Sequence, residues 1–181
     1  MIQKGGLVFY GGFIGALLAM VLYTRLKKIP LWKFADAVAP SIALGHTFGR
    51  IGCLMTGCCF GKQCSLPWAI TFPEGHETHV MGGLATPVHP TQIYEAVLNF
   101  SLYLFLAWFY QRKKFSGQVF AMYLICYAVL RSIVELFRAD YKPAEYYLNG
   151  LISPGQFVSI GIITAGLALF FLLPRRTVRT K

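Results

Sequence analysis

Residues 117–140 read GQVFAMYLICYAVLRSIVELFRAD, an apolar run into which arginine and glutamate are inserted. A helix needs about 20 apolar residues to cross the hydrocarbon core of a bilayer, so this run is long enough. Ionisable side chains inside such a run are costly and usually functional. Helical spacing places Tyr127, Arg131, Glu135 and Arg138 on one face. Two arginines against one glutamate leave a positive charge in excess, although a structural ion pair between helices is the alternative explanation.

The apolar residues form five such runs, at about 6–24, 34–54, 90–110, 117–137 and 152–173. The chain is 56% hydrophobic and 13% charged, with a mean hydropathy of +0.54. Soluble domains carry roughly a quarter charged residues, so this deficit is typical of a protein surrounded by lipid. The sequence predicts an all-α integral membrane protein, a single membrane domain over residues 1–181 with about five transmembrane helices.

The positive charges lie between the apolar runs. The net charge of +10 would suggest a nucleic-acid partner in a soluble protein. Here, however, eleven of the seventeen Lys and Arg residues fall in three segments, at 25–33, 112–114 and 175–181. Cytoplasmic loops of membrane proteins are enriched in these residues. We therefore predict that the N-terminus lies outside, the C-terminus inside, and a loop at about 55–89 outside, and we expect no nucleic-acid partner.

The chain begins MIQKGGLVFYGG, with no signal peptide. An N-terminus outside the membrane without such a segment suggests that upstream helices are missing from this sequence. A short protein whose N-terminus is naturally outside is the alternative.

A second arginine stands at the end of another apolar run. The stretch HTFGRIGCLMTGCCFG, residues 46–61, places His46, Arg50 and Cys53 on one helix face, with Arg50 near the predicted outer end. The topology brings this arginine toward Arg131 and Arg138. Planar guanidinium groups suit phosphate, and in a membrane the most available phosphate is a phospholipid headgroup.

The stretch HPTQIYEAVLNF, residues 89–100, opens the run that follows the long loop. Pro90 suits a first helical turn, and Gln92, Glu95 and Asn99 then share one face. Glu95 would therefore join Glu135 near the arginines at the outer surface. Capping of the helix at the membrane interface is the alternative explanation for His89 and Gln92.

Four of the five cysteines lie within twelve residues, with the spacing C-x4-C-C-x4-C from Cys53 to Cys64. Zinc sites usually pair their cysteines as CxxC, which this spacing does not match. Three of the four fall on the predicted outside, where disulfides persist in many bacteria. Disulfides or plain thiols are favoured, while a metal site and a redox or catalytic thiol remain open.

Five motifs together resemble the bacterial prolipoprotein diacylglyceryl transferases, in matching order and spacing over nearly the whole chain. They are GGLVFYGG, GRIGCLMTGCCFG, HPTQIYE, RSIVELFRAD and SPGQFVS. Members of that family have seven membrane helices, with the N-terminus outside and the C-terminus inside. The resemblance implies that this chain corresponds to the C-terminal part of that fold, without its first two helices.

The resemblance also implies an activity. The family transfers the diacylglyceryl group of phosphatidylglycerol to the thiol of the lipobox cysteine in a prolipoprotein, forming a thioether and releasing glycerol 1-phosphate. The implied partners are phosphatidylglycerol, the prolipoprotein signal-peptide region and membrane lipid, and the implied location is the bacterial inner membrane. No cofactor and no metal ion are expected.

Site residues follow from the same comparison. Arg50 matches the arginine of the family's GRxGN signature, and Arg131 matches the second key arginine. The resemblance implies catalytic roles for Arg131, Tyr10, Glu135 and Glu95. It implies phosphatidylglycerol binding by Arg50, Arg138, Gly49, Gly52, Cys53, Gly61, His89, Gln92 and Tyr94.

The chain departs from the family's pattern at four positions. Cys53 and Thr56 replace two asparagines, Cys58 replaces a glutamate, and Tyr10 replaces a histidine that is a candidate proton acceptor. A phenol is a weaker base than an imidazole at neutral pH. Two other functions therefore stay open: a non-catalytic paralogue that binds anionic phospholipid, and a membrane thiol or redox protein.

Overall fold

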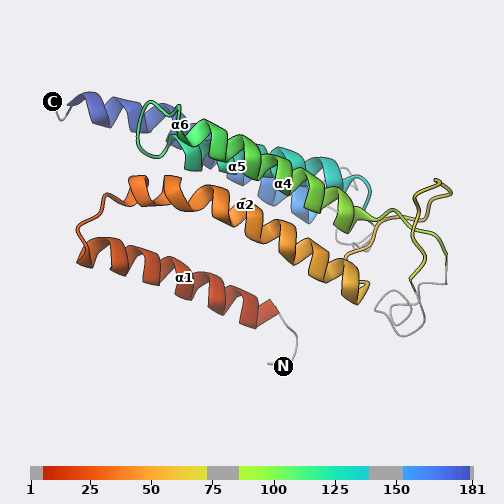
Figure 1. The fold of residues 1–181 in the computed structure, drawn as a ribbon. Helices are drawn as coiled ribbons and strands as arrows, with labels where there is room; N and C mark the ends of the chain where they lie inside the picture. Colours follow the sequence, from red (N-terminus) through yellow and green to blue (C-terminus); the bar gives the residue numbers. More distant parts are fainter. Residues whose placement is uncertain (1–5, 73–85, 139–152, 180–181) are drawn as a thin grey trace.

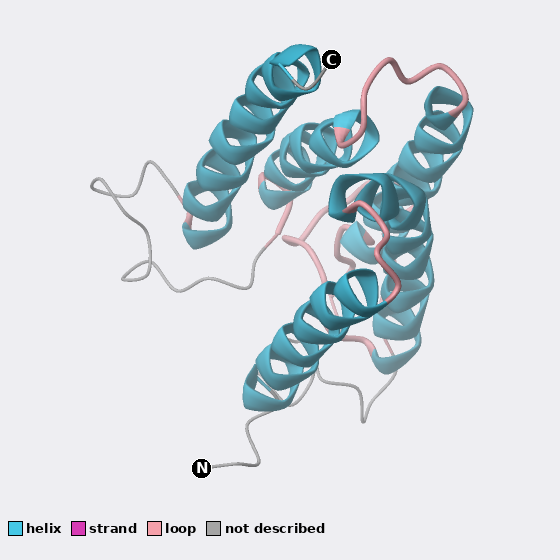
Figure 2. Cartoon of the chain, turned by 90° about the vertical axis from the view of Figure 1, so that its left-hand side faces the viewer, coloured by secondary structure: helices cyan, strands magenta, loops and turns pink. Residues whose placement is uncertain are grey.

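The structure is a computed structural model that describes residues 6–72, 86–138 and 153–179. Its five helices are α1 (Gly6–Leu26), α2 (Leu31–Thr56), α4 (Thr91–Tyr110), α5 (Gln118–Glu135) and α6 (Pro154–Arg179). Figure 2 shows only helices and loops among the described residues. The all-α prediction is confirmed, and each predicted run coincides with one helix.

Four helices form the bundle, and successive helices run in opposite directions (Figure 1). The most extensive contacts join α2 to α4 and α5 to α6, while α1 touches only α2 closely and lies to one side. The buried core consists of Ala39, Ala43, Leu102, Leu106, Val119 and Tyr123. The alanines of α2 allow the backbones of α4 and α5 to come close to α2, as small residues do at membrane helix interfaces.

A buried acid ties α2 to α5. Asp36 is fully buried, and its carboxylate accepts hydrogen bonds from the backbone N–H of Gly117 at 2.8 Å and of Phe120 at 3.0 Å. Lys113 Nζ lies 3.1 Å from the same carboxylate. The carboxylate therefore satisfies N–H groups that the first turn of α5 leaves without an intrahelical partner. Asp36 was not singled out from the sequence, because its partners lie about 80 residues away.

Three helices are long and apolar enough to cross a membrane among the described residues: α4, α5 and residues Gly155–Leu173 of α6. α2 is not among these helices, and the apolar part of α1 at Ile14–Leu26 is shorter. The expectation of a multi-helix membrane architecture is confirmed. Spanning by α1 and α2, and the direction of insertion, stay predictions.

One site residue lies elsewhere than predicted. The sequence predicts Arg138 on the same helix face as Tyr127, Arg131 and Glu135, but α5 ends at Glu135. The backbone beyond it turns toward the long loop, where Lys62 N–H donates to Phe137 O at 2.8 Å and Gly61 pairs with Arg138 in an isolated bridge. The side chain of Arg138 therefore enters the site from the segment after α5 that pairs with Gly61, and not from the face of the helix.

The link between α2 and α4 lies at the end of the bundle opposite the α1–α2 and α4–α5 links (Figure 1). Its described parts are residues 57–72 and 86–90, and the middle of the predicted outer loop lies outside the described residues. Ile70 pairs with Val88 in another isolated bridge. The two ends of the link are thus joined beside the N-terminus of α4.

Candidate active site

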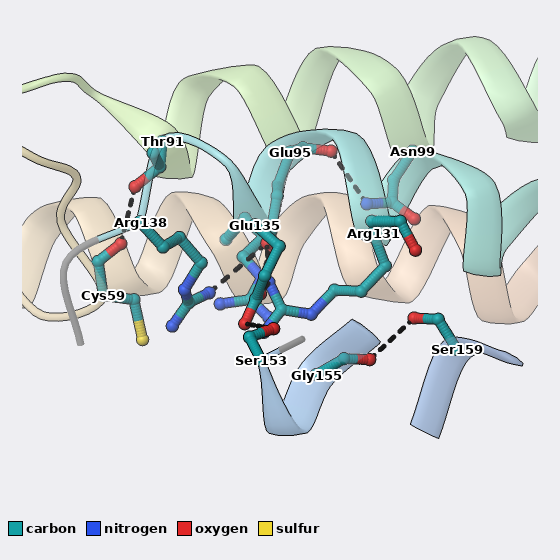
Figure 3. A network of polar contacts seen from close by, with 12 residues as sticks. Cys59, Thr91, Glu95, Asn99, Arg131, Glu135, Arg138, Ser153, Gly155 and Ser159 are labelled. Atoms are coloured by element: carbon teal, nitrogen blue, oxygen red, sulfur yellow. Dashed lines mark hydrogen bonds and ion pairs between the residues drawn. The ribbon is translucent and has the colours of Figure 1, made fainter. Parts of the chain in front are cut away.

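Five charged side chains meet where the C-terminal ends of α2 and α5 come together with the N-terminal part of α4. Glu95 lies at the centre and is paired with all three arginines. Arg50 Nε pairs with Glu95 Oε2, while Arg131 Nη1 and Arg138 Nη1 lie 2.9 Å and 3.3 Å from Oε1. Figure 3 shows Arg131, Arg138 and Glu95 converging above α6.

The second carboxylate connects this group to α6. Glu135 Oε2 lies 2.8 Å from Arg131 Nη1, the i,i+4 pair expected from the sequence. Glu135 Oε1 accepts a hydrogen bond from Ser153 Oγ at 3.0 Å. Gly155 lies against the same carboxylate, since a Cβ atom there would come within 2.6 Å of Oε1. The glycine therefore allows the start of α6 to approach Glu135.

The charges in this group do not cancel. Three arginines and two glutamates leave one positive charge among these five side chains. Glu95 and Arg138 are almost fully buried, with side chains 6% and 7% exposed. Arg50 and Arg131 remain 24% and 17% exposed. The two partly exposed guanidinium groups can accept an anion, while the buried charges hold them in place.

Three residues of the HPTQIYE stretch lie apart from this network. Tyr94 Oη accepts a hydrogen bond from Trp68 Nε1 at 2.8 Å and lies 3.3 Å from His89 Nδ1. His89 also packs against Phe137, with ring centroids 5.4 Å apart. Gln92 is 1% exposed, and its Nε2 donates to the carbonyl of Cys58 at 2.7 Å. Its amide thus holds the long loop in place.

The predicted glycines divide into two kinds. Gly49 and Gly52 are exposed on α2 beside Arg50, and a Cβ atom at either would meet nothing within 4 Å. Gly61 is enclosed, because a Cβ atom there would lie 2.6 Å from both His89 Cβ and Phe137 O. Cys53 is half-buried near Cys58 and Cys59. Tyr10 lies on α1, where the structure describes the backbone but not this side chain.

An apolar groove of about 510 Å³ runs between α4, α5 and the long loop. Its walls are formed by Leu66, Trp68, His89, Ile93, Tyr94, Val97, Leu98, Ile133, Val134 and Phe137. A second groove of about 320 Å³ continues along the same two helices and shares Leu98 with the first. Leu98 and Val134 also border a small pocket lined by Glu95 and Arg131, so the charged group lies next to the apolar surface.

The sequence profile described as prolipoprotein diacylglyceryl transferase matches residues 1–172. The chain belongs to this family. It is 38% identical over 165 residues to the phosphatidylglycerol–prolipoprotein diacylglyceryl transferase of Clostridium tetani, covering 91% of this chain and 63% of that protein. The proteins of the same name from Clostridium perfringens, numbered 2, and Bordetella avium are 37% and 38% identical, over 91% and 97% of this chain.

This diacylglyceryl transferase family member spans 61–64% of the length of those three relatives. The profile match and these identities confirm the predicted resemblance at the level of the family. Together with the apolar helices, membership identifies the chain as a multi-pass membrane protein whose relatives here are bacterial.

Two residues that contact the site were not predicted from the sequence. Ser153 and Gly155 contact Glu135, yet they belong to the SPGQFVS stretch, which was used only for the resemblance. A polar Ser-Pro-Gly sequence at the start of an apolar run was the available signal. Asn99 was noticed on the face of Glu95, and its Nδ2 donates to Glu95 O at 2.8 Å.

Proposed function

We propose that this chain transfers the diacylglyceryl group of phosphatidylglycerol to the lipobox cysteine thiol of prolipoproteins, forming a thioether and releasing glycerol 1-phosphate. The observation that carries the proposal is the convergence of Arg50, Arg131 and Arg138 on Glu95 next to an apolar groove. A site with an excess positive charge beside an apolar surface matches a lipid that joins a phosphate to acyl chains. The names of the relatives supply the donor lipid, the transferred group and the acceptor.

The proposed chemistry assigns a role to each charged residue. The acceptor sulfur attacks the terminal glycerol carbon of the lipid, a sulfur–carbon bond forms, and the carbon–oxygen bond to phosphate breaks. Negative charge grows on the leaving phosphate, and Arg50 and Arg131 stabilise it. Glu95 and Glu135 orient these guanidinium groups. The thiol proton passes to Tyr10 or Glu95, because thiolate is the reactive form.

The remaining predicted residues surround the lipid in this proposal. Arg138 contributes positive charge from its buried position, and Gly49 and Gly52 leave open space beside Arg50. His89 and Tyr94 line the apolar groove, where an acyl chain would lie along α4 and α5. Gln92 and Gly61 position the loop that closes one side of the groove.

The proposed location is the bacterial inner membrane, with the arginines at its outer surface. The Lys- and Arg-rich segments lie at the opposite end of the bundle, which supports this direction of insertion. The lipobox cysteine of a prolipoprotein would approach the site from the outer leaflet.

A non-catalytic lipid-binding protein is the second candidate. The observation that favours it is the set of changes at Tyr10, Cys53, Thr56 and Cys58, which replace polar residues of the family's signature. Such a protein would keep the arginines and bind phosphatidylglycerol without transferring its diacylglyceryl group.

The test is a transfer assay in proteoliposomes with labelled phosphatidylglycerol and a lipobox peptide. We expect Arg131→Ala and Arg50→Ala each to lower the transfer rate by about 10²–10³-fold, as loss of one charge-stabilising donor does. Arg112→Ala is the matched control, since Arg112 stacks on Trp108 at the other end of α4. Labelled lipid that binds but is never transferred by the unaltered chain would favour the second candidate.

A further inference from the structure

Three cysteines at the end of α2 and the start of the long loop come together although their spacing is irregular. The Sγ atoms of Cys53, Cys58 and Cys59 all lie within 4.8 Å of one another, and each residue is half-buried. Cys53 is on the last turns of α2, and the other two follow the end of that helix. The fourth cysteine of the pattern, Cys64, is not part of this group.

The backbone that carries these thiols is held from two sides. Gly57 ends α2 in the left-handed conformation, and the N–H of Cys58 returns to the carbonyl of Cys53 at 3.2 Å. From α4, Gln92 and Thr91 donate to the carbonyls of Cys58 and Cys59 at 2.7 Å and 2.8 Å. The loop is therefore fixed before any ligand binds.

Cys59 has a strained backbone. Its φ of 62° lies in the left-handed region, which a residue with a Cβ atom rarely adopts. Such strain persists only where the surroundings impose it, and it clusters at ligand sites. Here it accompanies the placement of the Cys59 thiol beside the other two.

We propose that Cys53, Cys58 and Cys59 bind one zinc ion as three thiolate ligands, leaving a fourth position open. Zinc is bound tetrahedrally with Zn–S bonds of about 2.3 Å, which places sulfur atoms about 3.8 Å apart. Small side-chain rotations bring the present positions to that spacing. Sulfur ligands select zinc or Cu(I) among common metal ions. A zinc site with three protein ligands and one open position is the arrangement used for chemistry rather than for structure.

The surroundings suit the charge of such a site. Two positive charges on zinc against three thiolates leave one negative charge. Arg50 lies one turn before Cys53 on α2, and Figure 3 shows Cys59 at the end of the polar network where Arg138 lies. The hydroxyl of Thr56 donates to Cys58 Sγ at 3.2 Å, an outer-shell hydrogen bond typical of metal ligands.

The open position gives this site a role in the transfer reaction. This part of the inference rests on the proposed function. The acceptor thiol binds the ion as thiolate, because a coordinated thiol is deprotonated outright, and its proton then passes to water instead of to Tyr10 or Glu95. Its sulfur then leaves the zinc and bonds to the glycerol carbon while the bond from that carbon to the phosphate oxygen breaks. Zinc would thus activate the thiol in place of the basic residue whose position Tyr10 occupies.

Zinc binding is tested on the reduced chain of residues 1–181 in detergent, which is dialysed against zinc and analysed for bound metal. We expect about one equivalent per chain, falling below roughly a fifth in Cys53→Ser, Cys58→Ser and Cys59→Ser. Cys64→Ser and Cys126→Ser are matched controls and keep the ion. Far-ultraviolet circular dichroism checks that each variant is helical. No zinc in the folded unaltered chain would overturn the proposal.

The open position is tested separately with cobalt in place of zinc. Adding a lipobox peptide should change the sulfur-to-cobalt absorption band, whereas a peptide with serine at the lipobox position should not. An unchanged band would overturn the open position even if transfer is observed. A changed band without any transfer would uphold this site and refute the transferase instead, so the two failures are distinguishable.

Discussion

At the scale of single residues, one carboxylate organises the candidate site. Glu95 is 5% exposed and shared by three arginines. Guanidinium groups that lose this shared carboxylate lose a compensating charge in a medium of low dielectric constant. Glu135, in contrast, pairs with Arg131 alone among the arginines of this group and has Ser153 as a further partner. The two acids should therefore differ in importance.

Glu95→Gln should lower stability more than Glu135→Gln. We expect the first change to cost about 3–5 kcal/mol, the range for removing one partner of a buried ion pair. The second should cost less, because Arg131 keeps Glu95 as a partner. Thermal unfolding of both variants in the same detergent measures the difference. Equal losses would mean that Glu95 does not act as the shared counter-charge.

At the scale of elements, the position of the start of α6 depends on the absence of a side chain at Gly155. A Cβ atom at Gly155 would lie 2.6 Å from the Glu135 carboxylate, whose position Arg131 and Ser153 also fix. The contact between α5 and α6 therefore determines where the Arg131–Glu135 pair lies. Packing of helices and geometry of the site are thus linked at one glycine.

Gly155→Ala should separate α6 from Glu135 and disturb Arg131. We expect a loss of about 1–3 kcal/mol, the cost of overpacking, together with reduced transfer. Gly161→Ala on the same helix is the matched control, since a Cβ atom there would meet nothing within 4 Å. Unfolding midpoints and transfer rates check both variants. A Gly155→Ala chain as stable and active as Gly161→Ala would contradict this account of the contact.

At the scale of the whole molecule, the two ends of the bundle differ in charge. The α1–α2 and α4–α5 links and the C-terminal end of α6 are rich in lysine and arginine, whereas the candidate site lies at the other end. The asymmetry predicts the direction of insertion. It also predicts that lipid and peptide meet the site from outside the cell membrane.

The direction of insertion can be measured with fusions after Lys181. A fluorescent protein that folds only in the cytoplasm should be bright at this position, and an alkaline phosphatase that is active only outside should be inactive. The physical reason is retention of the positive segments on the cytoplasmic side. The reverse pair of results would place the arginine cluster inside and exclude the proposed reaction at the outer leaflet.

The sequence by itself determined the helices and the family. Apolar runs of membrane-spanning length and helical spacing are local properties, so five helices, the Arg131–Glu135 pair and the shared face of Gln92, Glu95 and Asn99 could be predicted. The motifs and their order identified the family, which the profile match confirms. The predicted roles of single site residues stay predictions.

Only the tertiary structure decided which partners these residues take. The sharing of Glu95 by three arginines depends on how α2, α4 and α5 pack, and Arg138 arrives through a bridge to Gly61 beyond the end of α5. The meeting of three thiols depends on the turn at Gly57 and on hydrogen bonds from α4. Contacts between residues far apart in sequence carry no local periodicity, so packing alone establishes them.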